Sequence, residues 1–461
     1  MQLDGLPLFD SGTGLPDHLD PGELRFQQLK VSIHQRLVEA LDLSQIGQIE
    51  AAQLQQHVER LAQEACDARP EDLDGLDRRR LCEELMDEVF GLGPLEKLMH
   101  DPAISDVLVN GPYTVYVERG GRLELTRVIF ADAAHLVRII QRIVARLGRR
   151  IDEVNPMVDA RLPDGSRVNA VIPPLALNGP TLSIRRFGKN PLQIEDLLGN
   201  GTLIRPMAEF LAAAVQARVS CLISGGTGAG KTTLLNALSS CIPADERIIT
   251  IEDAAELRLR SKHWVRMETR PPNTEGAGEV TQRDLVRNSL RMRPNRIIVG
   301  EVRGAEVWDM LQAMNTGHEG SMTTIHANNA HDALTRLELM AALTGFELPV
   351  SAVRQYVAGG LTLIVQLARL QGGPRRLVQV SEIVNIADGN YCLEDLFGFE
   401  QTGVSAEGVA QGEFFATGYR PACLARLKAA GLVLPEETFQ PRRIPAPPPR
   451  EVSSPTGGSR P

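Results

Sequence analysis

The chain has 461 residues, of which 43% are hydrophobic and 23% are charged, as is usual for globular domains. Its formal net charge of −9 disfavours a surface that binds nucleic acid irrespective of sequence, because such surfaces concentrate Lys and Arg. No apolar run reaches the roughly 18 residues that cross a bilayer, and none of the six cysteines form C-x-x-C, so we expect neither a transmembrane segment nor a zinc ribbon.

The first part of the chain changes from helical to strand-like periodicity. Residues 1–21 are rich in Gly, Asp and Pro, which predicts disorder. Apolar side chains recur at helical spacing through much of residues 22–98, which predicts a small N-terminal helical unit. Alternating apolar residues and one amphipathic stretch, residues 131–149, predict an α+β domain over residues 99–187.

The rest of the chain predicts an α/β domain between two less regular segments. Residues 188–201 begin with Gly-Lys-Asn-Pro and are expected to form a linker. Strand-like and helix-like runs alternate over residues 202–388, which predicts a mainly parallel sheet with both faces covered. Residues 389–439 are expected to be a C-terminal extension with a short helix, and the Pro- and Ser-rich residues 440–461 a disordered tail.

Residues 225–232 read GGTGAGKT, the pattern G-x-x-x-x-G-K-[ST] of a phosphate-binding loop. A strand-like run precedes the loop and a helix-like run follows it, as the motif requires. Glycines let successive N–H groups face one phosphate, the lysine can reach the β- and γ-phosphates, and the threonine hydroxyl can ligate Mg²⁺. The residues assigned to the nucleotide are Gly225, Gly226, Thr227, Gly228, Ala229, Gly230, Lys231, Thr232 and Thr233.

Two neighbouring strand-like runs end in carboxylates, Glu252 and Glu301. Ligands bind at the carboxyl ends of strands in open parallel sheets, and an acid there can hold Mg²⁺, partly through water, or orient an attacking water. An apolar strand that ends in an acid is also common in other α/β proteins. The phosphate loop in the same expected sheet favours the functional interpretation of both residues.

His318 and His326 lie eight residues apart, and His326 ends another strand-like run. A neutral imidazole there can sense the γ-phosphate or hydrogen-bond a carboxylate. A zinc pair is less favoured, because no cysteine lies near and the only close third imidazole is His331. The alternative for both is a buried polar residue satisfied by the backbone, and it weighs more for His318.

Phosphoryl transfer also needs cations that offset charge on the transferred group. Arginine fingers contribute about 10³- to 10⁵-fold to such reactions. Four arginines at the end of the small domain can serve, within the chain or from a neighbouring copy, and a solvated basic edge is the alternative. These are Arg161, Arg167, Arg185 and Arg186.

Three further boxes follow the phosphate loop in order. Residues 250–253 (TIED), 291–303 (RMRPNRIIVGEVR) and 316–327 (TGHEGSMTTIHA) resemble the aspartate, Walker B and histidine boxes of the type II/type IV secretion ATPase superfamily. Gly300 stands where many ATPases place a metal-binding Asp, and Asn295 where an Asp is expected. The four-cysteine zinc insertion of type II secretion ATPases is missing.

Other segments resemble the tight-adherence (Flp) pilus ATPases of the CpaF/TadA type. They are residues 91–96 (GLGPLE), 109–112 (VNGP), 117–119 (VER), 270–276 (RPPNTEG) and 417–421 (TGYRP). The resemblance as a whole spans about residues 75 to 435. It implies an α/β fold with a RecA-like ATPase domain, and a homo-hexamer that binds ATP between that domain and the small one.

The resemblance also implies roles for the candidate residues. Glu252 is the base or water-orienting group, Glu301 is the Walker B acid near Mg²⁺, and the two histidines couple nucleotide state to domain position. The four arginines are candidate phosphate contacts. The expected protein is a cytoplasmic ATP hydrolase at the inner-membrane face that works with pilus platform proteins and contacts no nucleic acid. The alternatives are a conjugative type IV secretion ATPase and a nucleotide-gated scaffold with little turnover.

Overall fold

The structure is a computed structural model that describes residues 19–40, 56, 59–60, 63–64, 75–186, 191–272, 277–345, 349–406 and 408–446. Its contacts divide the chain into two compact units, Met1–Gly188 and Lys189–Pro461. Residues 1–18, most of the segment predicted to be disordered, lie outside the described residues. No helix among the described residues is long and apolar enough to cross a bilayer.

The first unit begins with helices that pack around a small apolar cluster and a buried charge network. Its helices are α1 (Pro21–Ala40), α3 (Gly75–Phe90), the 3₁₀ helix η2 (Gly93–Leu95) and α4 (Glu96–His100). Phe26 and Ile33 of α1 meet Leu81 and Leu85 of α3. The buried Nζ of Lys30 lies 3.2 Å from a carboxylate oxygen of Glu84, which ties the two helices together.

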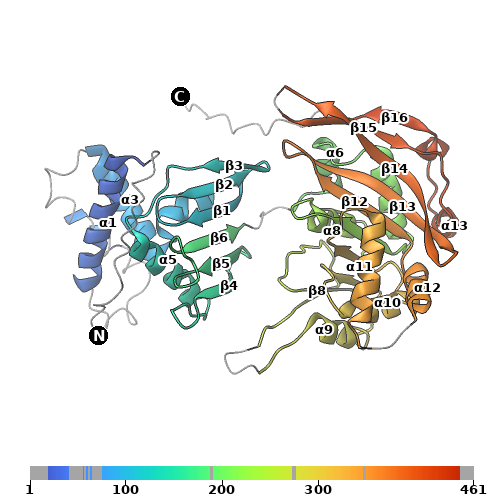
Figure 1. Cartoon of the computed structure of the whole chain (residues 1–461), viewed down its shortest axis with the longest axis horizontal. Helices are drawn as coiled ribbons and strands as arrows, with labels where there is room; N and C mark the ends of the chain where they lie inside the picture. Colours follow the sequence, from blue (N-terminus) through green and yellow to red (C-terminus); the bar gives the residue numbers. More distant parts are fainter. Residues whose placement is uncertain are drawn as a thin grey trace. The chain divides into compact units, whose positions relative to one another are not determined.

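A six-stranded antiparallel sheet and one amphipathic helix complete the first unit (Figure 1). The strand order is β3-β2-β1-β6-β5-β4. Alternate valines of the central strands and one apolar stripe of the helix share a single core, as their periodicity predicts. The elements are β1 (Ile104–Asn110), β2 (Val115–Arg119), β3 (Arg122–Leu125), α5 (Ala133–Arg146), β4 (Met157–Arg161), β5 (Arg167–Val171) and β6 (Thr181–Arg185).

The second unit is built on a ten-stranded sheet of order β16-β15-β14-β13-β12-β7-β11-β10-β8-β9. The six strands from β12 to β9 are parallel. These six are β7 (Cys221–Gly225), β8 (Ile248–Glu252), β9 (Trp264–Glu268), β10 (Arg296–Val299), β11 (Met322–Ile325) and β12 (Leu363–Arg369). The other four are β13 (Arg375–Ala387), β14 (Asn390–Val404), β15 (Ala410–Ala416) and β16 (Arg442–Pro445), which pair antiparallel.

Helices cover both faces of the parallel strands, which explains their continuous apolar sequences (Figure 1). Cys221 and Ile223 of β7 belong to one core, whereas Leu222 belongs to the other, because successive side chains alternate between faces. The helices are α6 (Ile194–Gly199), α7 (Arg205–Gln216), α8 (Lys231–Ser239), α9 (Gln282–Ser289), α10 (Glu306–Asn315), α11 (Ala330–Ala342), α12 (Val350–Gly360), α13 (Leu424–Ala429) and the 3₁₀ helix η3 (Glu436–Phe439).

Three local features differ from the sequence-based predictions. The expected linker, residues 188–201, contains α6, which starts with a capping box formed by Gln193 and Asp196. The expected boundary after residue 388 falls inside the hairpin of β13 and β14. The expected disordered tail begins with β16, where Ile444 pairs opposite Phe414 and packs on the core, and residues 447–461 lie outside the described residues. The domain boundaries otherwise stay predictions.

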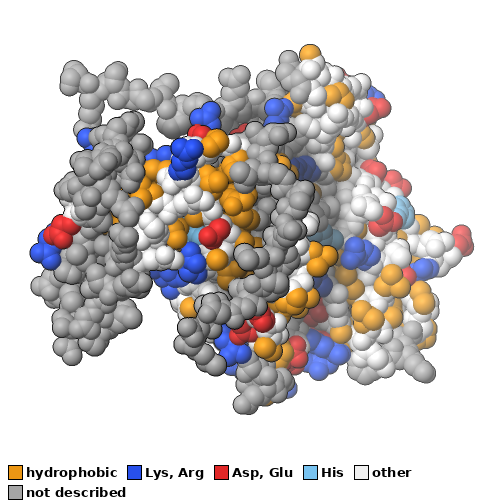
Figure 2. Space-filling view, turned by 60° about the vertical axis from the view of Figure 1, so that its left-hand side comes forward, with side chains coloured by type: hydrophobic (Ala, Val, Ile, Leu, Met, Phe, Trp, Pro, Cys, Tyr) orange, Lys and Arg blue, Asp and Glu red, His pale blue; other side chains and the backbone are white. Residues whose placement is uncertain are grey.

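Figure 2 shows basic, acidic and hydrophobic side chains interspersed over the visible face of the described residues. The basic side chains that can be seen there lie in separate groups and do not form one continuous field.

Candidate nucleotide-binding site

The phosphate-loop motif lies between β7 and α8, at the carboxyl edge of the parallel strands. Gly228 and Gly230 have φ angles of +71° and +98°, which favour glycine. A Cβ at Gly225 would lie 2.5 Å from the carbonyl oxygen of Leu367, so the loop also needs glycine where it leaves the sheet. The strand, loop and helix that the motif requires are therefore all present.

Lys231 is the first residue of α8, and only 7% of it is exposed. Its Nζ donates hydrogen bonds to the carbonyl oxygens of Gly225 and Gly226, both at 3.0 Å. The same Nζ lies 3.3 Å from Nε2 of His326. Thr232 and Thr233 follow in the first helical turn and are partly exposed. The lysine thus links the loop to the end of β11.

A chain of charged and polar side chains continues across the carboxyl edge. Nε2 of His326, just after β11, lies 2.8 Å from a carboxylate oxygen of Glu301, which follows β10. The other oxygen of Glu301 lies 2.7 Å from Arg303. Burial and the positive charge of Lys231 lower the pKa of His326, although Glu301 opposes them. The lowered pKa favours the neutral imidazole, whose Nε2 lies close to both the carboxylate of Glu301 and the ammonium group of Lys231.

Glu252 ends β8 and does not join this chain of contacts. Its Oε1 accepts hydrogen bonds from the backbone N–H groups of Glu256 and Leu257, at 2.7 and 2.9 Å. Its buried Oε2 has no hydrogen-bond partner among the described residues. Burial raises the pKa of Glu252 to about 7. Since β10 and β11 separate β8 from β7, the two strand axes are about 14 Å apart.

The structure gives a physical reason for Gly300. A Cβ at this position would lie 2.9 Å from Cγ of Glu252. Any larger residue at the end of β10 would displace the Glu252 side chain. The glycine at the position where many ATPases have a metal-binding Asp therefore leaves room for the Glu252 side chain of the neighbouring strand. Asn295 lies at the other edge of the sheet, where its side-chain oxygen accepts a hydrogen bond from the Arg247 N–H at 2.8 Å.

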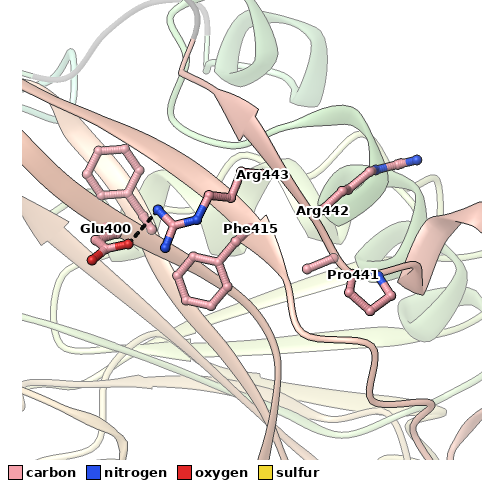
Figure 3. A pocket seen from close by; sticks show the side chains of 7 residues that line it. Glu400, Phe415, Pro441, Arg442 and Arg443 are labelled. Atoms are coloured by element: carbon pink, nitrogen blue, oxygen red, sulfur yellow. Dashed lines mark ion pairs between the residues drawn. The ribbon is translucent and has the colours of Figure 1, made fainter.

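Two hollows in the second unit differ in their surroundings. One, of about 390 Å³, lies beside the phosphate loop and is lined by Gly226, Thr227, His326, Ala327, Asn328, Asp332, Thr335 and Arg336. The other, of about 600 Å³, lies over β14 to β16, where Arg443 pairs with Glu400 and Arg442 points the opposite way (Figure 3). The first hollow contains residues of the phosphate loop, and the second contains none of the predicted site residues.

The model of the family described as "Type II/IV secretion system protein" matches residues 88–386. The chain belongs to this family. It is therefore an ATPase of the type II/IV secretion family, with the nucleotide-binding function that the family implies.

Two named sequence relatives support the same assignment, and one solved structure is similar to part of the chain. A Mycobacterium tuberculosis protein, provisionally named as a conjugal transfer protein, is 42% identical over 311 residues, which are 66% of this chain and 88% of the relative. The type IV secretion system protein VirB11 of Brucella suis is 33% identical over 293 residues, 58% of this chain and 81% of the relative. The solved structure of the Brucella suis VirB11 ATPase in complex with sulphate is 30% identical, covers 63% of this chain and 95% of that chain, and has a TM-score of 0.35.

His318 is not brought to the phosphate loop of this secretion ATPase. It precedes β11, whereas His326 follows it, so the two histidines lie at opposite ends of the strand. The Ser321 hydroxyl donates to the carbonyl oxygen of His318 at 2.7 Å, and the buried Nδ1 of His318 has no partner among the described residues. Within a single chain, His326 is therefore the histidine that lies beside the phosphate loop, and the predicted role of His318 stays a prediction.

The four predicted arginines lie in the first unit and divide into two kinds. Arg161 pairs with Arg167, and Arg167 with Arg185, so these three form one row across β4, β5 and β6. Arg186 instead donates to the carbonyl oxygens of Asp101 and Ile104, the latter at 2.9 Å. Arg186 thus holds the start of β1, whereas the other three form a cationic row.

Two arginines that touch the phosphate loop were not predicted. Arg369 ends β12 and Arg375 begins β13, so both come from the hairpin beside β7. Nε of Arg375 donates to the carbonyl oxygen of Gly228 at 2.9 Å. The Gly372-Gly373-Pro374 turn was the available signal, because it predicts that the two arginines lie opposite each other.

Proposed function

We propose that this ATPase hydrolyses ATP with Mg²⁺ as a hexamer and drives transport of the conjugal-transfer or type IV secretion kind at the cytoplasmic face of the inner membrane. One observation is the main support for the proposed reaction. Lys231 contacts the loop carbonyls and His326, and His326 contacts Glu301. The names of the relatives support the transport process.

The reaction is attack of water on the γ-phosphate. Lys231 turns from the loop carbonyls to the β- and γ-phosphate oxygens, which are the stronger acceptors because they are charged. Glu252 orients the water through its second carboxylate oxygen. A base with a pKa of about 7 suits this task, because its protonation then changes near the working pH. The cationic row Arg161, Arg167 and Arg185 offsets charge on the phosphates, within the chain or from a neighbouring copy.

The residues at the site include the oxygen donors that Mg²⁺ prefers. Among the described residues no three His, Cys, Asp or Glu side chains gather as a metal site. Mg²⁺ in nucleotide sites takes only one or two protein oxygens, with phosphates and waters as its other ligands. The hydroxyl of Thr232 and the carboxylate of Glu301, whose side chain is 19% exposed, match that donor set. When bound, the ion neutralises charge on the phosphate oxygens.

A phosphate-release assay tests the hydrolysis. The wild-type chain should release phosphate from ATP only with Mg²⁺, and K231A should lose on the order of 10²-fold or more, because a charged group at the phosphates is removed. A wild-type protein that binds ATP and releases no phosphate would instead be a nucleotide-gated scaffold. Light scattering with and without ATP checks the hexamer.

A tight-adherence pilus motor is the second candidate, supported by residues 91–96, 270–276 and 417–421. Parts of two of these segments also make local structure: Glu96 accepts from the Leu92 N–H at 2.6 Å, and the Tyr419 hydroxyl donates to Glu382 at 2.9 Å. Their residue types therefore follow partly from folding, and we place this candidate second. A deletion strain that keeps DNA or protein transfer and loses surface pili would reverse the order.

A further inference from the structure

The hairpin between β12 and β13 places two cations on the phosphate loop of the same chain. Besides its hydrogen bond to Gly228, Arg375 has its Cδ 3.5 Å from the position that a Cβ of Gly230 would occupy. Nη1 of Arg369 lies 3.4 Å from the corresponding position at Gly228. Both side chains therefore lie against the segment whose N–H groups are expected to hold phosphate.

Strand register fixes this placement. β12 pairs with β7 so that Leu367 is opposite Gly225, and Arg369 lies two residues further along the same strand. Arg369 thus extends past the end of β7 on the side of the loop. It is also the direct partner of Arg375 across β12 and β13. Arg376 faces the other way, is 3% exposed, and donates to the carbonyl oxygen of Asn200 at 3.1 Å.

The hairpin tip is itself held in place. The N–H of Leu370 donates to the carbonyl oxygen of Pro374 at 2.8 Å, and the N–H of Ala410 donates to that of Gln371 at 2.9 Å. Two guanidinium groups fixed in this way next to a phosphate loop suit an anion that both can contact, and Arg binds phosphate in a forked geometry.

The part of the nucleotide that Arg369 and Arg375 can contact depends on the side of the phosphate loop on which they lie. β12 lies on one side of β7, and β11 with β10 lies on the other. In the proposed reaction, His326 and Glu301, which follow β11 and β10, mark the end of the site that receives the γ-phosphate. A nucleotide that runs across the loop from that end has its α-phosphate and ribose on the side of β12.

We propose that Arg369 and Arg375 bind the α-phosphate end of the nucleotide within the same chain, and so set nucleotide affinity without acting on the transferred phosphate. The inference rests on the proposed nucleotide site. It differs from a purely structural role, in which Arg375 only holds the loop through Gly228.

The test measures kcat and KM for ATP, and the inhibition constants of ADP and pyrophosphate, for R369A, R375A and the control R443A. Arg443 lies on β16 of the same sheet and pairs with Glu400 of β14. We expect the inhibition constant of ADP and the KM for ATP to rise by about tenfold or more in R369A and R375A, as loss of a charged hydrogen bond predicts. The constant of pyrophosphate should stay within about twofold.

Three results would overturn the inference. An unchanged ADP constant means that the arginines do not contact the nucleotide. An equal rise for ADP and pyrophosphate means that the variants distort the loop. A fall in kcat with the ADP constant unchanged places the arginines at the γ-phosphate. If the wild-type chain releases no phosphate from ATP, the proposed function fails, whereas wild-type turnover with both variants equal to R443A defeats this inference alone.

Discussion

The two edges of the parallel sheet in the second unit hold ionic clusters of different character. At the amino edge, Arg296 is fully buried and makes two bonds to Glu246, at 2.6 and 2.8 Å. At the carboxyl edge the corresponding cluster is open, because the side chains of His326 and Arg303 are 33% and 56% exposed. The first cluster is satisfied by the protein itself, whereas the second faces the hollow beside the phosphate loop.

The pKa shifts separate the two edges in the same way. Burial alone would raise the pKa of Glu246, but the hydrogen bonds and charge of Arg296 hold it below its usual value. Burial raises the pKa of Glu252 to about 7, although two backbone hydrogen bonds and the charge of Arg266 oppose this rise. A carboxylate held in its ionised form stabilises the fold, whereas one with a raised pKa is poised for proton chemistry. The contrast is consistent with the proposal that the carboxyl edge carries the reaction and the amino edge stabilises the fold.

The largest effect is expected when the charge of Glu301 is removed from the carboxyl edge. E301Q should lower the rate of ATP hydrolysis by on the order of 10²- to 10³-fold, because a charge that faces the phosphates is removed. Nucleotide binding should remain, since the loop and Lys231 are unchanged. Phosphate release and equilibrium binding of ADP are the measurements. Wild-type turnover in E301Q would contradict the role assigned to Glu301.

Removing the buried ion pair at the amino edge should lower stability rather than the rate of ATP hydrolysis. R296M should lower the free energy of unfolding by up to about 3–5 kcal/mol, because it leaves the buried Glu246 with only the more exposed Arg218, at 3.4 Å, as a cationic partner. Urea denaturation measures the change. The double variant R296M/E246L is the matched control, and it should recover much of the loss because no buried charge then remains. A double variant as unstable as R296M would show that the ion pair is not the cause.

The third prediction concerns the pH dependence of stability that the raised pKa of Glu252 at the carboxyl edge produces. A carboxyl whose pKa is raised from 4.5 to about 7 on folding stabilises the native state while protonated, and this contribution is lost as the pH rises from 4.5 to 7. E252Q removes that loss, so its stability relative to the wild type should increase by up to about 3 kcal/mol over this range. Urea denaturation at several pH values measures it. A difference that does not vary with pH would contradict the raised pKa.

The smallest expected effect concerns Arg303, which is exposed. R303A should change the free energy of unfolding by less than about 1 kcal/mol, as for other surface ion pairs. Because the charge of Arg303 lowers the pKa of His326, the variant should raise that pKa. An NMR titration of the imidazole measures the shift. An unmoved titration curve would show that the cluster at the open edge is not coupled as described.

The fold and the part of the site that follows directly from strand ends can be predicted from the sequence, because the patterns that indicate them involve neighbouring residues. The phosphate loop, the acids after β8 and β10, and the histidine after β11 all lie next to strands whose apolar sequences are clear. The eight residues from His318 to His326 span a whole strand, and a strand carries its two ends to opposite edges of the sheet, which the sequence spacing alone does not show.

The other differences depend on pairing between distant strands, which no local pattern contains. Arg369 and Arg375 reach the loop only because β12 pairs with β7. β16 was expected to be disordered because its neighbours are prolines and arginines, yet Ile444 finds a partner in Phe414. The fork of Arg296 and Glu246 joins residues 50 positions apart.

The alignment of β12 with β7 has a consequence for engineering and for motif searches. Side chains alternate along a strand, so one residue inserted into β12 before Arg369 would turn that guanidinium to the opposite face of the sheet. Every letter of GGTGAGKT would survive such an insertion, and a search for the motif would still find it. An unchanged loop sequence would then not show whether the arginine of the neighbouring hairpin still faces the ligand.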